Sequence, residues 1–324
     1  MKRAQALIEP KRDTMAFEIY IANTRGMCAG VDRAIRTVNC ALDKYGDKVY
    51  VLHEVVHNKH VVQSLEQKGA TFVECIDDVP DGSVLIFSAH GVGLEIMAKA
   101  KNRNFINVID ATCPLVKRVH FKINKASQEH KKAIVIGHAG HQEVIGTVGQ
   151  YDGDKSNVHV VMSVDDVNAL NLDGKNLVFA TQTTLSIDEA AKTVQALKAK
   201  FPEIEGPVKD DTCYATQHRQ EAIKQLAQIC DVVLVAGSKN SSNSNRLREV
   251  AQSVGAVAYL IDDYTDIDNS WFDNAKKVGV SAGASAPEYL VQDIIKHLQT
   301  LCDVQVQGVG LIPADRVFPL PDNI

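Results

Sequence analysis

The stretches Asp110-Ala-Thr-Cys-Pro114 and Asp210-Asp-Thr-Cys213 carry the same Asp-x-Thr-Cys pattern about a hundred positions apart. A third cysteine, Cys28 in "TRGMCAG", stands at the matching point near the start of the chain. Each of the three is followed by a segment of helical period, an apolar strand-like run and a polar loop. This order indicates one structural plan that is used three times.

Matching features recur at nearly constant distances from the three cysteines. The polar loop is reached after 29, 28 and 28 positions, at His57, His141 and Ser241. An acidic pair ends 50, 53 and 50 positions after the cysteines, at Asp78, Asp166 and Asp263. Offsets that agree within three residues indicate an internal triplication.

Apolar runs alternate with segments of helical period along the chain. Runs such as "KVYVL", "AIVIG" and "VVLVAG" are typical of buried parallel strands, and "EYLVQDIIKHLQTL" is typical of an amphipathic helix. The alternation predicts an α/β fold of three similar units with mainly parallel sheets, arranged with pseudo-threefold symmetry around a common centre. We expect a disordered N-terminal extension at 1–14 and units at 15–109, 110–209 and 210–324, the last with a C-terminal tail.

The composition favours a globular protein that binds a small ligand. Of the 324 residues, 45% are hydrophobic and 23% are charged, and a net charge of −5 gives no basic footprint for nucleic acid. No apolar run approaches the roughly 20 residues that a membrane span needs. Seven cysteines without paired spacing favour a reducing compartment, so we expect a cytoplasmic protein with neither a membrane nor a nucleic acid as partner.

The three repeated cysteines are the expected metal ligands. Each would stand where a helix begins, with Thr112 or Thr212 as the helix cap, and the helix dipole would lower the thiol pKa. Three thiolates that meet at one point suit either zinc with an open fourth position or an iron–sulfur cubane with one free iron. The other cysteines lie in or beside apolar runs and are expected to be small buried residues: Cys40, Cys75, Cys230 and Cys302.

Polar loops follow several predicted strands, at the sheet edge where open α/β proteins bind ligands. Their hydroxyl, amide and imidazole groups would suit a small anion such as a diphosphate. The candidate residues are His57, His90, His141, Thr183, Thr184, Ser241, Ser242, Asn243 and Ser285. Glu143 is the carboxylate of this set, and it is either a solvated loop acid or a proton donor.

The stretch "HEVVH" at 53–57 matches the His-Glu-x-x-His pattern of zinc hydrolases. That pattern requires both histidines on one face of a helix. Here the preceding "KVYVL" predicts a strand, so the match would span a strand end and a loop. We therefore do not interpret it as a zinc site.

Nine motifs in order carry a resemblance to a known family. They are "RGMCAGVDRAI", "EVVHN", "FSAHGV", "DATCPLV", "IGHAGHQEVIGT", "TQTTLS", "DDTCYATQHRQEA", "GSKNSSNSNRL" and "AGASAP", and they extend from about Phe17 to about Gly310. Together they resemble the LytB/IspH family, the 4-hydroxy-3-methylbut-2-enyl diphosphate reductases. Two positions depart from the family pattern: Thr24 and Met27 stand where Pro and Phe are expected.

The resemblance implies an oxidoreductase that acts on a small allylic diphosphate. Its substrate would be (E)-4-hydroxy-3-methylbut-2-enyl diphosphate, and its products isopentenyl and dimethylallyl diphosphate, at the last step of the methylerythritol phosphate route to isoprenoids. Cys28, Cys113 and Cys213 would hold a [4Fe-4S] cluster with one open iron. Flavodoxin or ferredoxin would supply the electrons.

The resemblance also implies roles for the loop residues. Glu143 would be the proton donor, with Thr183 and His141 as its catalytic partners. The diphosphate would be held by His57, His90, Ser241, Ser242, Asn243 and Ser285, with Thr184 as a weaker candidate. Two other functions remain as alternatives: a zinc-dependent hydrolase that uses the same cysteines, and a non-catalytic iron–sulfur sensor that binds a diphosphate.

Overall fold

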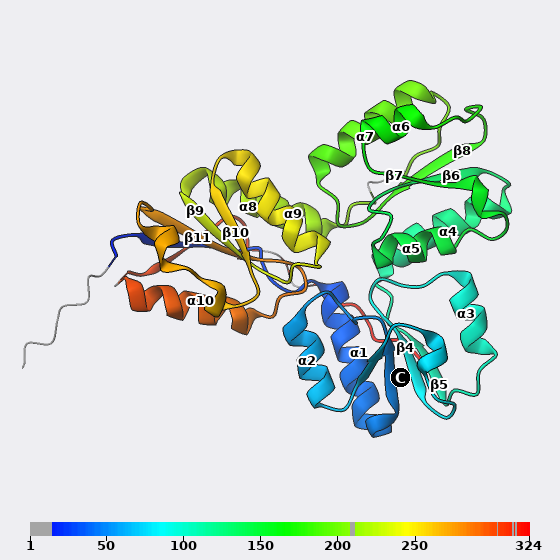
Figure 1. Cartoon of the computed structure of the whole chain (residues 1–324), viewed down its shortest axis with the longest axis horizontal. Coiled ribbons are helices and arrows are strands. Elements are labelled where there is room, and N and C mark those ends of the chain that lie inside the picture. The colour runs from blue at the N-terminus through cyan, green and yellow to red at the C-terminus, as the bar shows by residue number, and fades with distance from the viewer. Residues whose placement is uncertain (1–14, 208–210, 303, 313, 315) are drawn as a thin grey trace, which may run out of the picture.

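The computed structural model describes residues 15–207, 211–302, 304–312, 314 and 316–324. It contains three parallel β-sheets with helices packed on them, and the three layered units surround a common centre (Figure 1). The predicted α/β fold of three similar units is thereby confirmed. The N-terminal extension expected at 1–14 and Asp210 of the third cysteine motif lie outside the described residues. In the described part of the chain, no helix is long and apolar enough to cross a membrane.

The first sheet has the strand order β3-β2-β4-β5. Its strands are β2 (Val49–Leu52), β3 (Thr71–Val73), β4 (Val84–Phe87) and β5 (Asn107–Asp110). Its helices are α1 (Ala29–Tyr45), α2 (Lys59–Gln67) and α3 (Leu94–Lys101), with the short helices η1 (Gly46–Lys48) and η2 (Ile76–Asp78) in the connections. In β4, Val84 and Ile86 pack toward α1 and α2, whereas Leu85 and Phe87 pack on the side of α3. This alternation is that of a strand buried on both faces.

The second sheet has the order β7-β6-β8. Its strands are β6 (Lys132–Ile136), β7 (Val158–Val161) and β8 (Leu177–Thr181). Its helices are α4 (Pro114–Gln128), α5 (Gln142–Gly149), α6 (Val164–Ala169) and α7 (Ile187–Lys200), with η3 (Lys155–Asn157) in a connection. An isolated parallel bridge from Val178 of β8 to Glu205 marks the place of a fourth strand.

The third sheet has the order β10-β9-β11-β1-β12. Its strands are β9 (Val232–Ala236), β10 (Val257–Ile261), β11 (Lys277–Ala282), β1 (Glu18–Ala22) and β12 (Val306–Val309). Its helices are α8 (Tyr214–Ile229), α9 (Ser242–Val254) and α10 (Glu288–Leu301), with η4 (Tyr264–Asp266) and η5 (Asn269–Phe272) in the connections. Every strand pair in the three sheets is parallel.

The three units share one layout. In each, the helix after the cysteine and the helix after the polar loop lie on one face of the sheet: α1 and α2, α4 and α5, α8 and α9. The remaining helices, α3, α6 with α7, and α10, lie on the other face. Each acidic pair follows the strand at one edge of its sheet: the first lies in η2, the second in α6 and the third just before η4. The structure therefore repeats the layout that the spacing predicted.

The first strand departs from the expected unit boundaries. β1 pairs with β11 and β12 in the third sheet, so residues 18–22 do not form part of a first unit that begins at residue 15. The reason is the fourth strand position, which in every unit leads into the next cysteine. β5 fills it before Cys113, the bridge at Glu205 fills it before Cys213, and β1 fills it before Cys28. The start of the chain thus completes the third unit.

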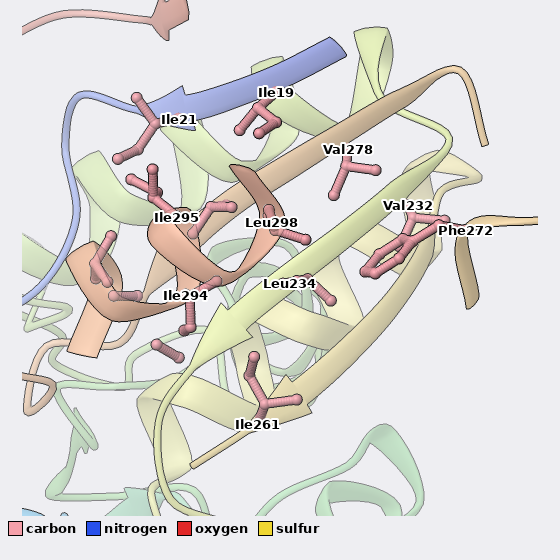
Figure 2. Packing of buried hydrophobic residues seen from close by; sticks show 14 of the residues in the cluster. Ile19, Ile21, Val232, Leu234, Ile261, Phe272, Val278, Ile294, Ile295 and Leu298 are labelled. Atoms are coloured by element: carbon pink, nitrogen blue, oxygen red, sulfur yellow. The ribbon is translucent and has the colours of Figure 1, made fainter. Parts of the chain in front are cut away.

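Buried apolar side chains hold β1 in this distant sheet. Ile19 and Ile21 of β1 pack in one cluster with Val278 of β11 and with Ile294 and Leu298 of α10 (Figure 2). All five are buried. Apolar burial stabilises by about 25 cal/mol per Å². This gain offsets the entropy lost when two ends of the chain are joined.

The first and second units meet through glycine backbone. A Cβ added at Gly93, just before α3, would lie 2.7 Å from the Cα of Gly149 at the end of α5. The side-chain Nε2 of Gln150 donates to the carbonyl oxygen of Val92 across the same interface between the two units, at 2.6 Å. No side chain fits between the two backbones, so the glycines fix the separation of the units.

The C-terminal tail crosses from the third unit to the first. Arg33 Nε of α1 donates to the carbonyl oxygen of Pro319 at 2.7 Å, and Arg36 Nη2 donates to that of Phe318 at 2.9 Å. Asn323 Nδ2 donates to the carbonyl oxygen of Val108 in β5 at 2.9 Å. The tail thereby connects the third unit to the first.

We expect Gly93→Ala to lower the free energy of unfolding by about 1–3 kcal/mol, because its methyl group would press on backbone that has no side chain to move aside. Urea unfolding measures the change. Gly140→Ala is the control, since nothing lies within 4 Å of a Cβ at that position. Equal free energies of unfolding for the two variants would show that the two backbones can move apart without loss of stability.

Candidate active site

The three repeated cysteines each stand at the start of a helix. Cys28, Cys113 and Cys213 are the N-cap residues of α1, α4 and α8. The prediction of Thr112 and Thr212 as caps is therefore wrong by one residue. The thiol replaces the usual cap hydroxyl: in α8 the Cys213 sulfur accepts the backbone N–H of the third helical residue at 3.3 Å.

All thirteen candidate residues line one pocket between the three units, here called the central pocket. They are Cys28, His57, His90, Cys113, His141, Glu143, Thr183, Thr184, Cys213, Ser241, Ser242, Asn243 and Ser285. The pocket measures about 680 Å³ including its open mouth. The roles of the individual residues remain predictions.

The cysteine thiols are packed closely together. A Cβ added at Gly30 would lie 2.6 Å from the Cys113 sulfur and 3.9 Å from the Cys28 sulfur. Burial raises the pKa of Cys113 to about 12, and proximity to Cys28 adds to the rise. Burial also raises the pKa of Cys213. The expectation that the helix dipole would lower these pKa values is therefore wrong for Cys113 and Cys213: backbone N–H groups stabilise the thiolates, but burial outweighs them.

The number and position of the thiols suit a polynuclear group. Within the described residues, no group of three or more His, Cys, Asp or Glu side chains converges closely enough to hold one metal ion. Three thiols around a shared pocket can instead each bind a different iron of a cluster. Gly30 leaves the space between two of the sulfurs free of side chain. The donor set and this space therefore fit a three-thiolate iron–sulfur cluster.

Glu143 is buried, and Thr183 donates two hydrogen bonds to its carboxylate. It lies in the first turn of α5, and its Oε1 accepts the backbone N–H of Thr183 at 2.6 Å. The Thr183 hydroxyl donates to Oε2 at 3.0 Å. Burial raises the pKa of Glu143 to about 7, although both Thr183 contacts oppose the rise. The reading of Glu143 as a solvated loop acid is therefore wrong, because its side chain is inside the protein and can carry a proton near neutral pH.

An ion pair between a partly buried lysine and a buried carboxylate supports the loop that carries Thr183. Lys122 of α4 contacts both carboxylate oxygens of Asp211 at 2.7 Å. Asp211 Oδ2 also accepts the backbone N–H of Thr181 at 3.1 Å, and the Cys213 N–H donates to the carbonyl oxygen of Thr183. The same short stretch thus positions a cysteine and the partner of Glu143. The sequence analysis did not identify Lys122 or Asp211, since their pairing joins positions 89 residues apart.

Three histidines form one cluster on the pocket wall. The rings of His57 and His90 stack with centroids 4.2 Å apart, and His141 meets both edge-on. His141 Nδ1 accepts the backbone N–H of Glu143 at 3.1 Å, so the neutral ring carries its proton on Nε2. Burial lowers the pKa of His141 to about 4 and that of His90 well below its usual value. His90 and His141 are therefore neutral hydrogen-bonding groups at pH 7.

The start of α9 offers a set of donors to an anion. Ser241 is its N-cap, and Ser242 and Asn243 are its first two residues. Asn243 Oδ1 accepts the N–H of Ala284 at 2.8 Å, while its buried Nδ2 has no partner among the described residues. A buried donor without a partner is costly, and a bound anionic oxygen would satisfy it. Ser285 lies in the adjoining loop and donates to the carbonyl oxygen of His57 at 2.9 Å.

The pocket also has an apolar side that the sequence analysis did not anticipate. Its members are Val31, Val56, Ala89, Leu115, Val116 and Ala284. They come from segments of all three units, and each reads as an ordinary core residue in the sequence. Together with the polar residues they form a site with a hydrocarbon-compatible part and an anion-binding part.

Two further sequence predictions have clear outcomes. The "HEVVH" stretch follows β2 and precedes α2, so it is a loop rather than a helix, as predicted. Of the four cysteines expected to be buried, Cys230 and Cys302 are buried and Cys40 is partly buried, but Cys75 is exposed. Cys75 caps η2, with its sulfur accepting the N–H of Asp77, and this position lies at the surface.

Comparisons with known proteins agree on one family. A family model described as LytB protein matches residues 19–299. A curated relative from Serratia proteamaculans is 54% identical over 95% of this chain and 97% of its own, and one from Yersinia enterocolitica is 57% identical over the same shares. Both are named 4-hydroxy-3-methylbut-2-enyl diphosphate reductase.

Solved structures show the same fold. A Plasmodium falciparum protein described as E-1-hydroxy-2-methyl-but-2-enyl-4-diphosphate reductase superposes with a TM-score of 0.88 at 38% identity, covering 95% of this chain and 96% of its own. A second, described as (E)-4-hydroxy-3-methyl-but-2-enyl diphosphate reductase, gives a TM-score of 0.62 at 30% identity, covering 88% and 99%.

Replacing Glu143 by glutamine tests its pKa. Because the folded-state pKa of about 7 exceeds the usual 4.5, the native protein loses stability as the pH rises from about 4.5 through about 7. Glu143→Gln removes this loss. We expect the free energy of unfolding of the variant, relative to the unaltered chain, to increase by about 1–3 kcal/mol between pH 5 and pH 8.

Chemical unfolding of the metal-free protein at several pH values measures this difference. The control is Glu203→Gln, which makes the same substitution at an exposed carboxylate. If the difference in free energy of unfolding for Glu143→Gln does not change with pH, then Glu143 is ionised throughout this range.

Proposed function

The chain belongs to the LytB family, and on this premise we propose that it is an iron–sulfur reductase that converts (E)-4-hydroxy-3-methylbut-2-enyl diphosphate to isopentenyl and dimethylallyl diphosphate. The observation that carries the proposal is the meeting of three cysteine-capped helices, the Glu143–Thr183 pair and the start of α9 in the central pocket. Each would serve one part of a reductive dehydroxylation.

Cys28, Cys113 and Cys213 would hold a [4Fe-4S] cluster. When bound, the cluster would supply electrons and, at an iron without a protein thiolate, a Lewis acid for the substrate hydroxyl. The three cysteines come from different units, so cluster binding would also bridge the units. Because the Cys113 and Cys213 thiols have raised pKa values, their protons must be released when the cluster binds.

The diphosphate would lie at the start of α9. Backbone N–H groups there, the Ser241 and Ser242 hydroxyls and the unpaired Asn243 Nδ2 can donate to its oxygens. His57, His90 and Ser285 lie on the same pocket wall, and Thr184 lies 3.2 Å from Ser242 through their hydroxyl oxygens. The many donors explain how a pocket lined by no described lysine or arginine could hold this anion.

Glu143 would supply a proton. The reaction consumes two electrons and two protons: the allylic C–O bond breaks, the oxygen leaves as water, and the carbon skeleton gains one hydrogen. A carboxyl group with a pKa of about 7 is partly protonated at neutral pH, and Thr183 fixes its orientation. His141 Nε2–H can donate to the substrate hydroxyl, since its Nδ1 is already engaged. Protonation at either end of the allylic system gives the two products.

The zinc-hydrolase alternative needs ligands that meet at one ion, and the described side chains do not converge in that way. The sensor alternative needs no proton donor. A buried Glu143 that accepts two hydrogen bonds from Thr183 in the ligand pocket instead favours an enzyme over a sensor. The electron supply would come from a one-electron carrier such as flavodoxin or ferredoxin.

The cluster assignment predicts metal content. After anaerobic reconstitution we expect about four iron and four sulfide per chain. Cys213→Ser should lose the visible absorbance of the cluster, whereas Cys40→Ser should keep it, because Cys40 lies within α1 and outside the pocket. Bound zinc without sulfide would support the hydrolase instead.

The proton-donor assignment predicts a separation of binding from turnover. Glu143→Gln keeps the side-chain volume but has no proton to transfer, so the cluster spectrum and the substrate-induced change in it should persist. Turnover should fall by roughly 10²–10⁴-fold. Glu203→Gln should behave like the unaltered enzyme. A Glu143→Gln enzyme with normal turnover would remove Glu143 from the reaction, and no turnover by any form would point to the sensor.

A further inference from the structure

A second hollow reaches Cys28 from outside the central pocket. We call it the arginine hollow and define it by Arg25, Met27, Cys28, Tyr214, Arg219 and Arg316, which line it. Among the described residues that line the two cavities, Cys28 is common to both. Tyr214 directly follows Cys213 and forms part of the hollow's wall. The hollow thus approaches two of the three repeated cysteines without passing through the substrate's pocket.

The arginine hollow carries positive charge on a chain whose net charge is −5. Three arginines and no Asp or Glu are present among the described residues that line it. Arg219 is buried and donates to the carbonyl oxygens of Gly26 and Met27, and it forms no salt bridge with the carboxylates that the structure describes. Arg25 pairs with Glu288, whose side chain is half exposed. A local positive field on an acidic protein attracts an acidic partner to this one place.

Exposed apolar side chains lie next to the charges. Met27 is 40% exposed in the wall of the hollow. Leu311, Ile312 and Val317, at 84%, 83% and 72%, are close in sequence to the lining residues Ala314 and Arg316. Leu311 is held beside the hollow, since the hydroxyl of Thr24, which lines it, donates to the carbonyl oxygen of Leu311 at 2.9 Å. Exposed Met and Leu beside Arg is the composition of a protein-binding surface.

Aromatic contact fixes one of the charges over the hollow. The Arg316 guanidinium lies 4.1 Å from the centre of the Tyr214 ring. A stacked arginine keeps its donors free at the edge, so it can still bind a carboxylate of a partner. Tyr214 in turn directly follows Cys213 in the chain, so the stacked pair lies next to one of the repeated cysteines.

We propose that the arginine hollow and its apolar border are the docking surface for an acidic one-electron carrier protein, which delivers electrons on the Cys28 side. This inference rests on the proposed reductase function. Each turnover needs two electrons, so two reduced carriers are oxidised in succession while one C–O bond breaks and two protons are consumed. The substrate would fill the central pocket during this time, whereas the arginine hollow reaches Cys28 from outside that pocket.

The test uses the cluster-loaded enzyme and a reduced [2Fe-2S] ferredoxin of the acidic plant type as the probe. Arg316→Glu and Leu311→Asp each change an exposed position of the docking surface. Lys192→Glu, an exposed position on α7 of the second unit, is the matched control for charge reversal. Arg316→Lys keeps the charge and serves as the rescue variant.

Calorimetry gives the Kd for the carrier, and turnover is compared with the carrier and with reduced methyl viologen, which needs no docking surface. We expect Arg316→Glu and Leu311→Asp to weaken carrier binding by at least about tenfold and to lower carrier-driven turnover in parallel. Turnover with methyl viologen should stay unchanged. Arg316→Lys should bind nearly normally, and binding should weaken as salt is raised.

Equal carrier binding by Arg316→Glu, Leu311→Asp and Lys192→Glu would overturn the docking surface. So would competition of inorganic diphosphate with the carrier for the unaltered hollow at micromolar concentration, which would make it a small-anion site. Failure of the proposed function looks different: the unaltered enzyme would not turn over even with methyl viologen.

Discussion

The positive ends of helices meet at the centre of this protein, and the rest of the structure is arranged around that meeting. α1, α4 and α8 begin at the three cysteines, α5 begins at His141, and α9 begins at Ser241. Unpaired N–H groups at helix starts favour anionic ligands, so the pocket needs no cationic side chain to do so. Three repeated units supply these helix starts from three directions, which a single α/β unit could not do.

Burial decides how the groups at this centre are charged. The same exclusion of water that raises the pKa of Glu143 and of two cysteine thiols lowers the pKa of His90 and His141. At neutral pH the Cys113 and Cys213 thiols keep their protons, Glu143 is partly protonated, and His90 and His141 are neutral, so these groups leave little uncompensated buried charge. These groups can still give a proton or bind a metal when a bound anion or cluster balances the charge.

The interfaces between the units are formed by different kinds of contact. Glycine backbone sets the distance between the first and second units. Between the first and third, Lys59 lies 3.1 Å from Asp262 and His60 lies 3.0 Å from Asp263, so the third acidic pair of the triplication joins two units. A repeated sequence feature has thus acquired a separate use in one copy.

The sequence by itself determined the kind of protein: the triplicated spacing predicted three parallel α/β units, and the repeated cysteines and polar loops predicted the residues that the structure brings into one pocket. These features are local, because strand and helix periods and helix starts are set by nearby residues. What only the tertiary structure decided depends on distant partners. β1 joins the third sheet because Ile19 and Ile21 are buried there, and Asp211, which is paired with Lys122 of α4, supports the loop of Thr183. The pKa values also depend on the tertiary structure. The position of the cysteines at helix starts predicted lowered thiol pKa values, whereas burial raises the pKa of Cys113 to about 12, and no short stretch of sequence encodes the depth of burial.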